Sequence, residues 1–233
     1  MEKNLFDKEL GNITLRTSPR VKRYSLKVSN GAIIAIMPER GNEQTMLDFI
    51  NKSRSKLIEA LKKERPQPTR LDDTTEMQTN TFKLHIFRTD REHIYMSLSE
   101  GVLHIACPQQ TNFEHEMIQQ ILKDMLERAL RHEAKRVLPV RLHALAKQYG
   151  FSYARVRIAN TKSRWGSCST SGSINLSLSL MLLPNHLIDY VLLHELCHTV
   201  EMNHSERFWE LMNKVTLNKA LSLRKELKNY RML

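Results

Sequence analysis

Two segments in the N-terminal half alternate apolar and polar residues, and each leads through a glycine-containing turn into a second apolar run. The first segment covers residues 24–38 and the second covers residues 94–108. Alternation at a period of two predicts β-strands, and the glycine supplies the positive φ that a tight turn requires. We therefore predict one β-hairpin in each segment, with a proline at the end of each hairpin.

A stretch with helical spacing follows each predicted hairpin, from Thr45 to about Lys62 and from Phe113 to about Val137. Pro139 is expected to break the second helix, because its ring clashes with the preceding turn, and a shorter helix should follow it. Strand–strand–helix thus occurs twice, which we interpret as an internal repeat. The polar, proline-bearing residues 65–75 predict a linker between the two units.

From residue 151 onward the pattern changes to short strands followed by helices. Alternating residues predict strands near 155–158, 165–168 and 174–178. A helix should run from Pro184 to about Met202, because proline is favoured in the first turn of a helix. The remaining residues should form a further helical region. These elements predict an α+β fold in which two hairpin-plus-helix units precede a small sheet and a buried helix.

The composition is that of a folded protein with an excess of positive charge. Hydrophobic residues make up 41% of the chain and charged residues 26%, which is ordinary for a globular protein. The net charge of +11 and the pI near 9.7 attract polyanions such as nucleic acid, an anionic membrane surface or acidic proteins. A solvated basic surface explains the same charge equally well.

The cysteines and the chain start suggest where the protein resides. Cys107, Cys168 and Cys197 form no C-x-x-C pair, which excludes a cysteine zinc cluster and argues against a disulfide framework. Reduced thiols are typical of the cytosol. The first residues are polar, and no stretch approaches the roughly 20 apolar residues of a membrane helix. We expect a soluble, cytoplasmic protein that does not associate with membranes.

The segment that carries candidate chemistry is His194-Glu195-Leu196-Cys197-His198, an H-E-x-x-H within a predicted helix. Residues four apart lie on one helix face, so His194 and His198 can reach one ion. Glu195, about 100° further round the helix, can lie beside a water in an open metal position and take its proton. A catalytic zinc usually has three protein ligands, and His204 is the expected third.

The surroundings of the motif favour a metal site over a chance pair of surface histidines. Apolar neighbours predict a buried helix, where unpaired polar groups would each cost about 1–3 kcal/mol without a metal. Glu201 stands where the metzincin pattern H-E-x-x-H-x-x-G-x-x-H has glycine, so the helix needs a different exit. Asn203 is the candidate residue for that exit, in a left-handed conformation, and Ser205 should cap the next helix.

Three segments together resemble the YgjP-like zinc metallopeptidases, relatives of the SprT-like and WLM families within the zincins. The segments are Ser163-Arg164-Trp165-Gly166-Ser167-Cys168, the strand Ile174-Asn175-Leu176, and the H-E-x-x-H helix with Asn203-His204-Ser205 and Phe208-Trp209. The similarity is specific over about residues 150–215. One departure is visible, because Ser177 and Leu178 stand where the family's strand carries asparagine and an aromatic residue.

The resemblance implies a zincin-like catalytic region over residues 151–233, with a small sheet, an active-site helix and substrate along an edge strand. It implies zinc ligands at His194, His198 and His204, and a catalytic acid/base at Glu195. Residues 1–70 would form the first hairpin unit, and residues 71–150 a second unit packed on the catalytic region.

Trp165, Gly166 and Ser167 are candidates for the strand that faces substrate, because glycine lets another backbone approach closely. The alternative interpretation of Trp165 is a core residue at a strand turn.

These observations favour a zinc-dependent metallopeptidase that hydrolyses proteins or peptides; the oligomeric state stays open. The alternative is a nucleic-acid-associated zinc protein, suggested by the basic residues of the first hairpin, Arg16, Arg20, Lys22, Arg23 and Lys27. A structural zinc normally has four protein ligands, and only three are found, which argues against a purely structural site. Both interpretations hold if the N-terminal half recruits the peptidase to DNA- or RNA-bound proteins.

Overall fold

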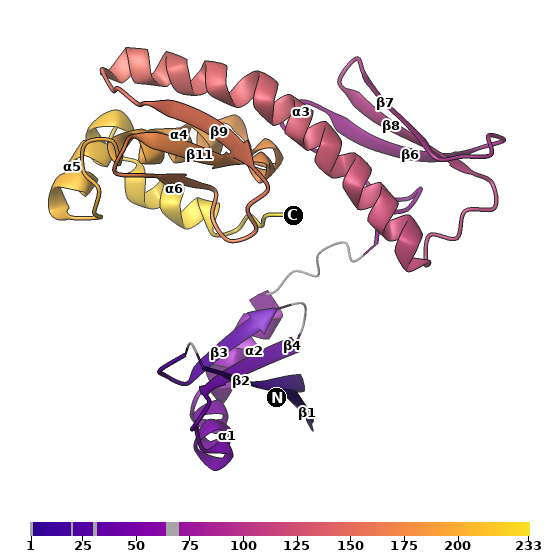
Figure 1. Cartoon of the computed structure of the whole chain (residues 1–233), viewed down its shortest axis with the longest axis vertical. Helices are drawn as coiled ribbons and strands as arrows, with labels where there is room; N and C mark the ends of the chain where they lie inside the picture. Colours follow the sequence, from indigo (N-terminus) through magenta and orange to yellow (C-terminus); the bar gives the residue numbers. More distant parts are fainter. Residues whose placement is uncertain (1, 20, 30–31, 64–69) are drawn as a thin grey trace. The chain divides into compact units, whose positions relative to one another are not determined.

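The computed structural model describes residues 2–19, 21–29, 32–63 and 70–233, and these residues form an α+β fold, as predicted. The chain divides into two compact units, residues 1–69 and 70–233 (Figure 1). Each unit has its own hydrophobic core.

The first unit is a four-stranded sheet packed against two helices. Its strand order is β1-β2-β4-β3, with β2 and β4 parallel and the outer pairs antiparallel. Alternation places Ile13, Leu15, Ile33 and Ala35 on the face that packs against the helices. The elements are β1 (Glu2–Asp7), β2 (Gly11–Ser18), β3 (Ser25–Ser29), β4 (Ala32–Pro38), α1 (Glu43–Lys52) and α2 (Arg54–Lys63).

The first predicted hairpin corresponds to β3 and β4, and its turn residues Asn30 and Gly31 lie outside the described residues. The single helix expected after it is two helices, because α1 ends at Lys52, Ser53 caps it, and α2 begins at Arg54. The linker residues 65–69 also lie outside the described residues.

The second unit begins with a sheet that has the same strand order and pairing as the first. The order is β5-β6-β8-β7, with β6 and β8 parallel and the outer pairs antiparallel. The second predicted hairpin corresponds to β7 and β8. The internal repeat of hairpin-plus-helix units stays a prediction. The elements are β5 (Met77–Gln78), β6 (Lys83–Thr89), β7 (Tyr95–Ser99) and β8 (Val102–Pro108).

The long helix α3 (Glu116–Tyr149) runs along both sheets of this unit (Figure 1). It corrects the expectation that Pro139 breaks the helix, because Pro139 lies inside α3. Leu130, Leu138 and Leu142 are fully buried on both sides of the proline. Continuous burial of one helix face therefore outweighs the local cost of the missing N–H. The helix ends at Gly150, whose φ of 73° is left-handed.

The C-terminal part contains a three-stranded sheet of order β10-β11-β9, in which β10 is an edge strand. The expected third strand ends at Ser177, because the Ser177 hydroxyl accepts from Ser179 N and begins a 3-10 turn. The elements are β9 (Arg155–Ala159), β10 (Gly166–Cys168), β11 (Ser173–Ser177), η1 (Leu178–Leu182), α4 (Asn185–Cys197), α5 (Glu206–Val215) and α6 (Ala220–Leu227).

One hydrophobic core joins α3, α4, α5 and the sheet strands of the second unit, so the helix with the H-E-x-x-H motif lies in the interior. The last helical region is divided at Leu217 and Asn218, which both have positive φ. Within the described residues, no helix is long and apolar enough to cross a membrane.

Candidate metal centre

Helix α4 presents the motif from a buried position. Leu192, Leu196 and Cys197 are completely buried around it, which accounts for the helix being apolar on nearly every side. Its first turns are fixed by Arg141 of α3, which donates to both carboxylate oxygens of Asp189 and, at 2.6 Å, to Asn185 Oδ1. The two histidines therefore stand on a helix with little freedom to move.

The chain leaves α4 earlier than expected, and this corrects the role proposed for Asn203. The helix ends at Cys197, and His198 caps it with a right-handed backbone. Among the described non-glycine residues, only Glu100, Leu217 and Asn218 have positive φ. The turn is closed instead by Glu201, whose N–H donates to Cys197 O at 2.9 Å. A local backbone hydrogen bond thus closes the turn that uses glycine in the metzincin pattern.

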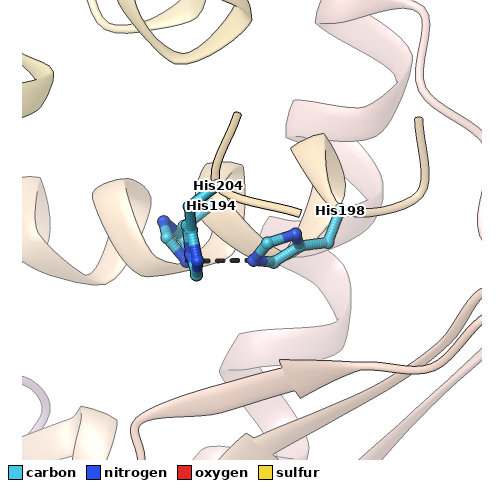
Figure 2. Close-up of side chains that lie close together, drawn as sticks. All are labelled: His194, His198 and His204. Atoms are coloured by element: carbon cyan, nitrogen blue, oxygen red, sulfur yellow. Dashed lines mark hydrogen bonds between the residues drawn. The ribbon is translucent and has the colours of Figure 1, made fainter. Parts of the chain in front are cut away.

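The turn brings His204 back to the helix, and the three imidazoles converge (Figure 2). His194 Nε2 lies 3.2 Å from His198 Nε2 and 3.1 Å from His204 Nε2. Nitrogens bound tetrahedrally to one zinc ion at about 2.1 Å lie about 3.4 Å apart. The observed spacing therefore fits a single ion held by three imidazoles.

Burial favours the neutral, metal-binding form of two of the imidazoles, those of His194 and His204. Burial lowers the pKa of His194 to about 3, and the neighbouring His198 and His204 act in the same direction. Burial, followed by His198 and Arg224, also lowers the pKa of His204. A neutral imidazole has a free lone pair, so His194 and His204 need no deprotonation before they accept a cation.

Hydrogen bonding and ring packing orient the ligands. His198 Nδ1 lies 3.0 Å from Glu201 O, and donation to this carbonyl would leave Nε2 free for an ion. The fully buried Phe208 lies under all three imidazoles, with ring centroids at 5.0 Å from His194, 4.6 Å from His198 and 4.8 Å from His204. Ser205 caps α5 as expected, accepting from Phe208 N.

Glu195 is 4% exposed and lies against the edge strand of the sheet. A Cβ at Gly166 would lie 2.6 Å from Glu195 Oε1 and 2.7 Å from its Cγ, so only glycine leaves room for this carboxylate. Burial raises the pKa of Glu195 to about 8, and the charge of Arg164 opposes this shift. A bound dication would lower the pKa of Glu195, in the same direction as the charge of Arg164.

Two buried polar atoms at this site have no hydrogen-bond partner among the described residues, Glu195 Oε2 and His194 Nδ1. Unpaired buried groups of this kind cost about 1–3 kcal/mol each. A carboxylate oxygen without a protein partner, next to three converging imidazoles, is consistent with a site built for an ion and a water.

A cleft of about 310 Å³ opens onto this site. Trp165 and Gly166 line it, whereas Ser167 of the predicted substrate strand does not. Tyr190, Trp209 and Arg224 also line the cleft. Of the metal-site side chains, His194, Glu195 and His204 line it and His198 does not. Tyr190 and Arg224 were not predicted as wall residues. No local signal identifies Arg224, since it lies on α6 and reaches the site only through the fold.

Other polar residues near the motif have structural partners. Asp189 pairs with Arg141, and His186 lies 2.7 Å from Glu226. All three cysteines are free, and burial raises the pKa of Cys197 to about 12, which makes it an inert core thiol. The Nδ1 atoms of His85 and His104 lie 3.4 Å apart on the first sheet of the second unit, and neither residue lines the cleft.

A mixed α+β fold that clusters three imidazoles near a buried carboxylate, with a cleft that opens onto them, has the composition of a metal-dependent hydrolase. The family model of the YgjP-like metallopeptidase domain matches residues 22–230. The chain therefore belongs to the YgjP-like metallopeptidases, as the sequence segments indicated, and its substrates are proteins or peptides.

Among solved structures, the chain is similar to the metallopeptidase zymogen of Pyrococcus abyssi abylysin. The two are 24% identical, the alignment covers 42% of this chain and 100% of that one, and the TM-score is 0.37. No curated protein sequence matches the chain.

Proposed function

We propose that this metallopeptidase uses zinc, held by His194, His198 and His204, and that Glu195 transfers the proton during peptide-bond hydrolysis. One observation carries the proposal. Three Nε2 atoms converge at distances that suit one ion, beside a buried carboxylate oxygen that no described residue engages.

Zinc suits this donor set because imidazole is one of its preferred ligands, and three protein ligands are typical of a catalytic zinc. When bound, zinc supplies Lewis acidity that makes water a nucleophile at neutral pH. A structural zinc would need a fourth protein ligand, and no further histidine or cysteine belongs to the cluster in the described part of the chain.

Glu195 is placed to move a proton in both directions. Its carboxylate takes the proton from the attacking water, and the resulting carboxylic acid donates this proton to the amide nitrogen of the leaving group. Gly166 leaves the space that this carboxylate occupies, since any side chain at position 166 would displace it. The buried surroundings exclude bulk water, so the proton passes to the leaving amine.

Tyr190 is placed to assist the same step. Its side chain lines the cleft, its ring lies 6.1 Å from that of His194, and no described residue hydrogen-bonds its hydroxyl. A free hydroxyl can donate to the oxyanion that forms on the scissile carbonyl. Tyr190→Phe should lower kcat with little change in KM, because the oxyanion exists only in the transition state.

The test combines metal analysis with hydrolysis of an unfolded protein substrate. Glu195→Gln should retain one zinc per chain and lose about 100- to 10,000-fold in rate, the contribution typical of a general acid/base. His204→Ala should lower both zinc content and rate. Glu210→Gln, at an exposed position on α5, controls for the loss of a carboxylate. A Glu195→Gln variant with the wild-type rate would refute the proposal.

A second candidate function, association with nucleic acid, draws on the outer face of the first sheet. Arg16 and Lys27 lie on the face opposite the core, and Arg16 lies 2.7 Å from Glu2. Lys22 and Arg23 are exposed, whereas Arg20 lies outside the described residues. Phosphate contacts release counterions, so DNA binding should weaken steeply with salt and fall in a Lys22, Arg23 and Lys27 triple alanine variant.

A further inference from the structure

Two arginines line the metal cleft without a carboxylate partner. Arg164 and Arg224 both belong to the wall, and neither forms an ion pair with any Asp or Glu among the described residues. Several other arginines of the same unit do form ion pairs with Asp or Glu. The arginines that are ion-paired there include Arg70, Arg88, Arg131, Arg136 and Arg141.

The guanidinium of Arg224 is held in the cleft by aromatic packing. Its central carbon lies 5.1 Å from the Trp209 ring centroid, and the Trp209 ring stacks on His204 with centroids 6.0 Å apart. A guanidinium that lies over a ring is oriented while its N–H groups stay free at the edge. This contact chain fixes a positive charge close to the proposed metal ligands.

Arg164 supplies a second charge to the cleft from a different part of the fold. It lies just before edge strand β10, two residues from Gly166, whereas Arg224 lies on α6. The charge of Arg164 opposes the effect of burial on Glu195, which indicates that it acts within the site. With a dication bound, the cleft would hold three positively charged groups and only one carboxylate.

We propose that Arg164 and Arg224 bind a carboxylate of the peptide substrate. The inference rests on the proposed peptidase function of this cleft and adds a preference for substrates that place a carboxylate there. Guanidinium groups match carboxylates through paired N–H donors, and such charge-assisted bonds are about twice as strong as neutral ones. The carboxylate belongs either to an Asp or Glu side chain near the scissile bond or to the free C-terminus of the substrate.

The two tryptophans provide a measurement of binding that does not depend on turnover. The chain contains only two tryptophans, Trp165 and Trp209, and both line this cleft. Intrinsic fluorescence therefore reports occupancy of the site. The zinc-loaded Glu195→Gln variant is titrated with alanine-based hexapeptides that carry either one glutamate or one glutamine at each position in turn. Each peptide is made with a free and with an amidated C-terminus.

Tighter binding of the glutamate peptides, by about tenfold, identifies a side-chain carboxylate, and tighter binding of the free acids identifies the C-terminus. Arg164→Gln and Arg224→Gln, each introduced into the same background, should abolish the preference. Lys225→Gln, at the exposed neighbouring position on α6, is the matched control and should retain it.

Equal binding of all peptides to the parent variant overturns the proposal. Retention of the preference in either arginine variant removes that residue from the carboxylate site and overturns the paired assignment. A third result also contradicts it. If the single arginine variants with Glu195 intact lose kcat equally for all peptides and their KM values stay unchanged, the arginines stabilise the transition state instead.

Failure of the proposed role of Glu195 can be distinguished from failure of the carboxylate proposal. If Glu195→Gln hydrolyses peptides at the wild-type rate, the assignment of Glu195 fails, whereas the fluorescence titration still measures whether the arginines select a carboxylate.

Discussion

Gly166→Ala adds one methyl group at the point where the edge strand β10 contacts Glu195. The new methyl carbon would lie 2.6 Å from Oε1, 2.7 Å from Cγ and 2.8 Å from Cδ of Glu195. Contacts under 3.0 Å cannot persist, and Glu195, at 4% exposure, has little space to swing away. The carboxylate must move by several tenths of an ångström, or the strand must move.

The expected magnitudes follow from that displacement. Overpacking of a filled interior costs about 1–3 kcal/mol of stability. Misplacement of a catalytic group by about 1 Å can lower the rate about 100-fold. The three nearest atoms all belong to Glu195, so the histidines keep their positions. We expect kcat/KM to fall by about 100-fold while zinc content stays at the wild-type value.

The assay compares peptide hydrolysis, zinc content and melting temperature with those of Gly172→Ala. Gly172 has a φ of 69° and lies in the turn between β10 and β11. Alanine there costs about 1–2 kcal/mol of backbone strain but touches only the region of Ala154. The control should therefore lose stability and retain its rate. If Gly166→Ala hydrolyses peptide as fast as Gly172→Ala, the contact does not position Glu195 and the reasoning is refuted.

Three further changes test the supports of the site. Phe208→Leu removes the ring beneath the imidazoles and should weaken zinc binding by about 10-fold, measured by competition with a chromophoric chelator; unchanged affinity would contradict its positioning role. Arg141→Ala should lower stability by about 1–2 kcal/mol in chemical denaturation, because α4 loses its contact with α3 at Asp189; a cycle with Asp189→Ala should show that the effects are not additive. The hydrogen bond from Arg136 holds the pKa of Glu133 below its usual value of 4.5, so this contact stabilises the fold above that pH and is lost as the pH falls through the folded-state pKa. The difference in melting temperature between wild type and Glu133→Gln should therefore shrink from pH 7 to pH 3, and a growing difference would contradict the assignment.

The convergence of the three histidines was predictable because it depends on local spacing. His194 and His198 are one helical turn apart, and His204 follows within a short connection, so the sequence limits where each imidazole can lie. Ser205 was identified for the same reason, since capping depends on neighbouring residues. The alternation of Ile13 and Leu15 in β2 was also a readable signal, and it was missed.

The errors at Pro139 and Arg224 concern residues that depend on distant partners, whereas the error at Asn203 is local. Pro139 stays within α3 because burial of residues on both sides of it outweighs its local cost. Asn203 was chosen for its left-handed tolerance, but the turn after α4 is closed by the local hydrogen bond from Glu201 N to Cys197 O, and Asn203 has no positive φ. Arg224 escaped notice because α6 meets the cleft only after the helices pack. Local propensity cannot reveal such contacts.

The closeness of Gly166 to Glu195 links substrate binding to proton transfer. The edge strand β10 has one unpaired side, which can accept an extended peptide by backbone hydrogen bonds. The same strand sets the position of the proposed proton carrier through a glycine that admits no side chain. A peptide that pairs with β10 would therefore be aligned by the element that also positions Glu195. Alignment of the peptide and placement of the Glu195 carboxylate then depend on the same backbone atoms of β10. A shift of this strand would therefore disturb both peptide binding and proton transfer.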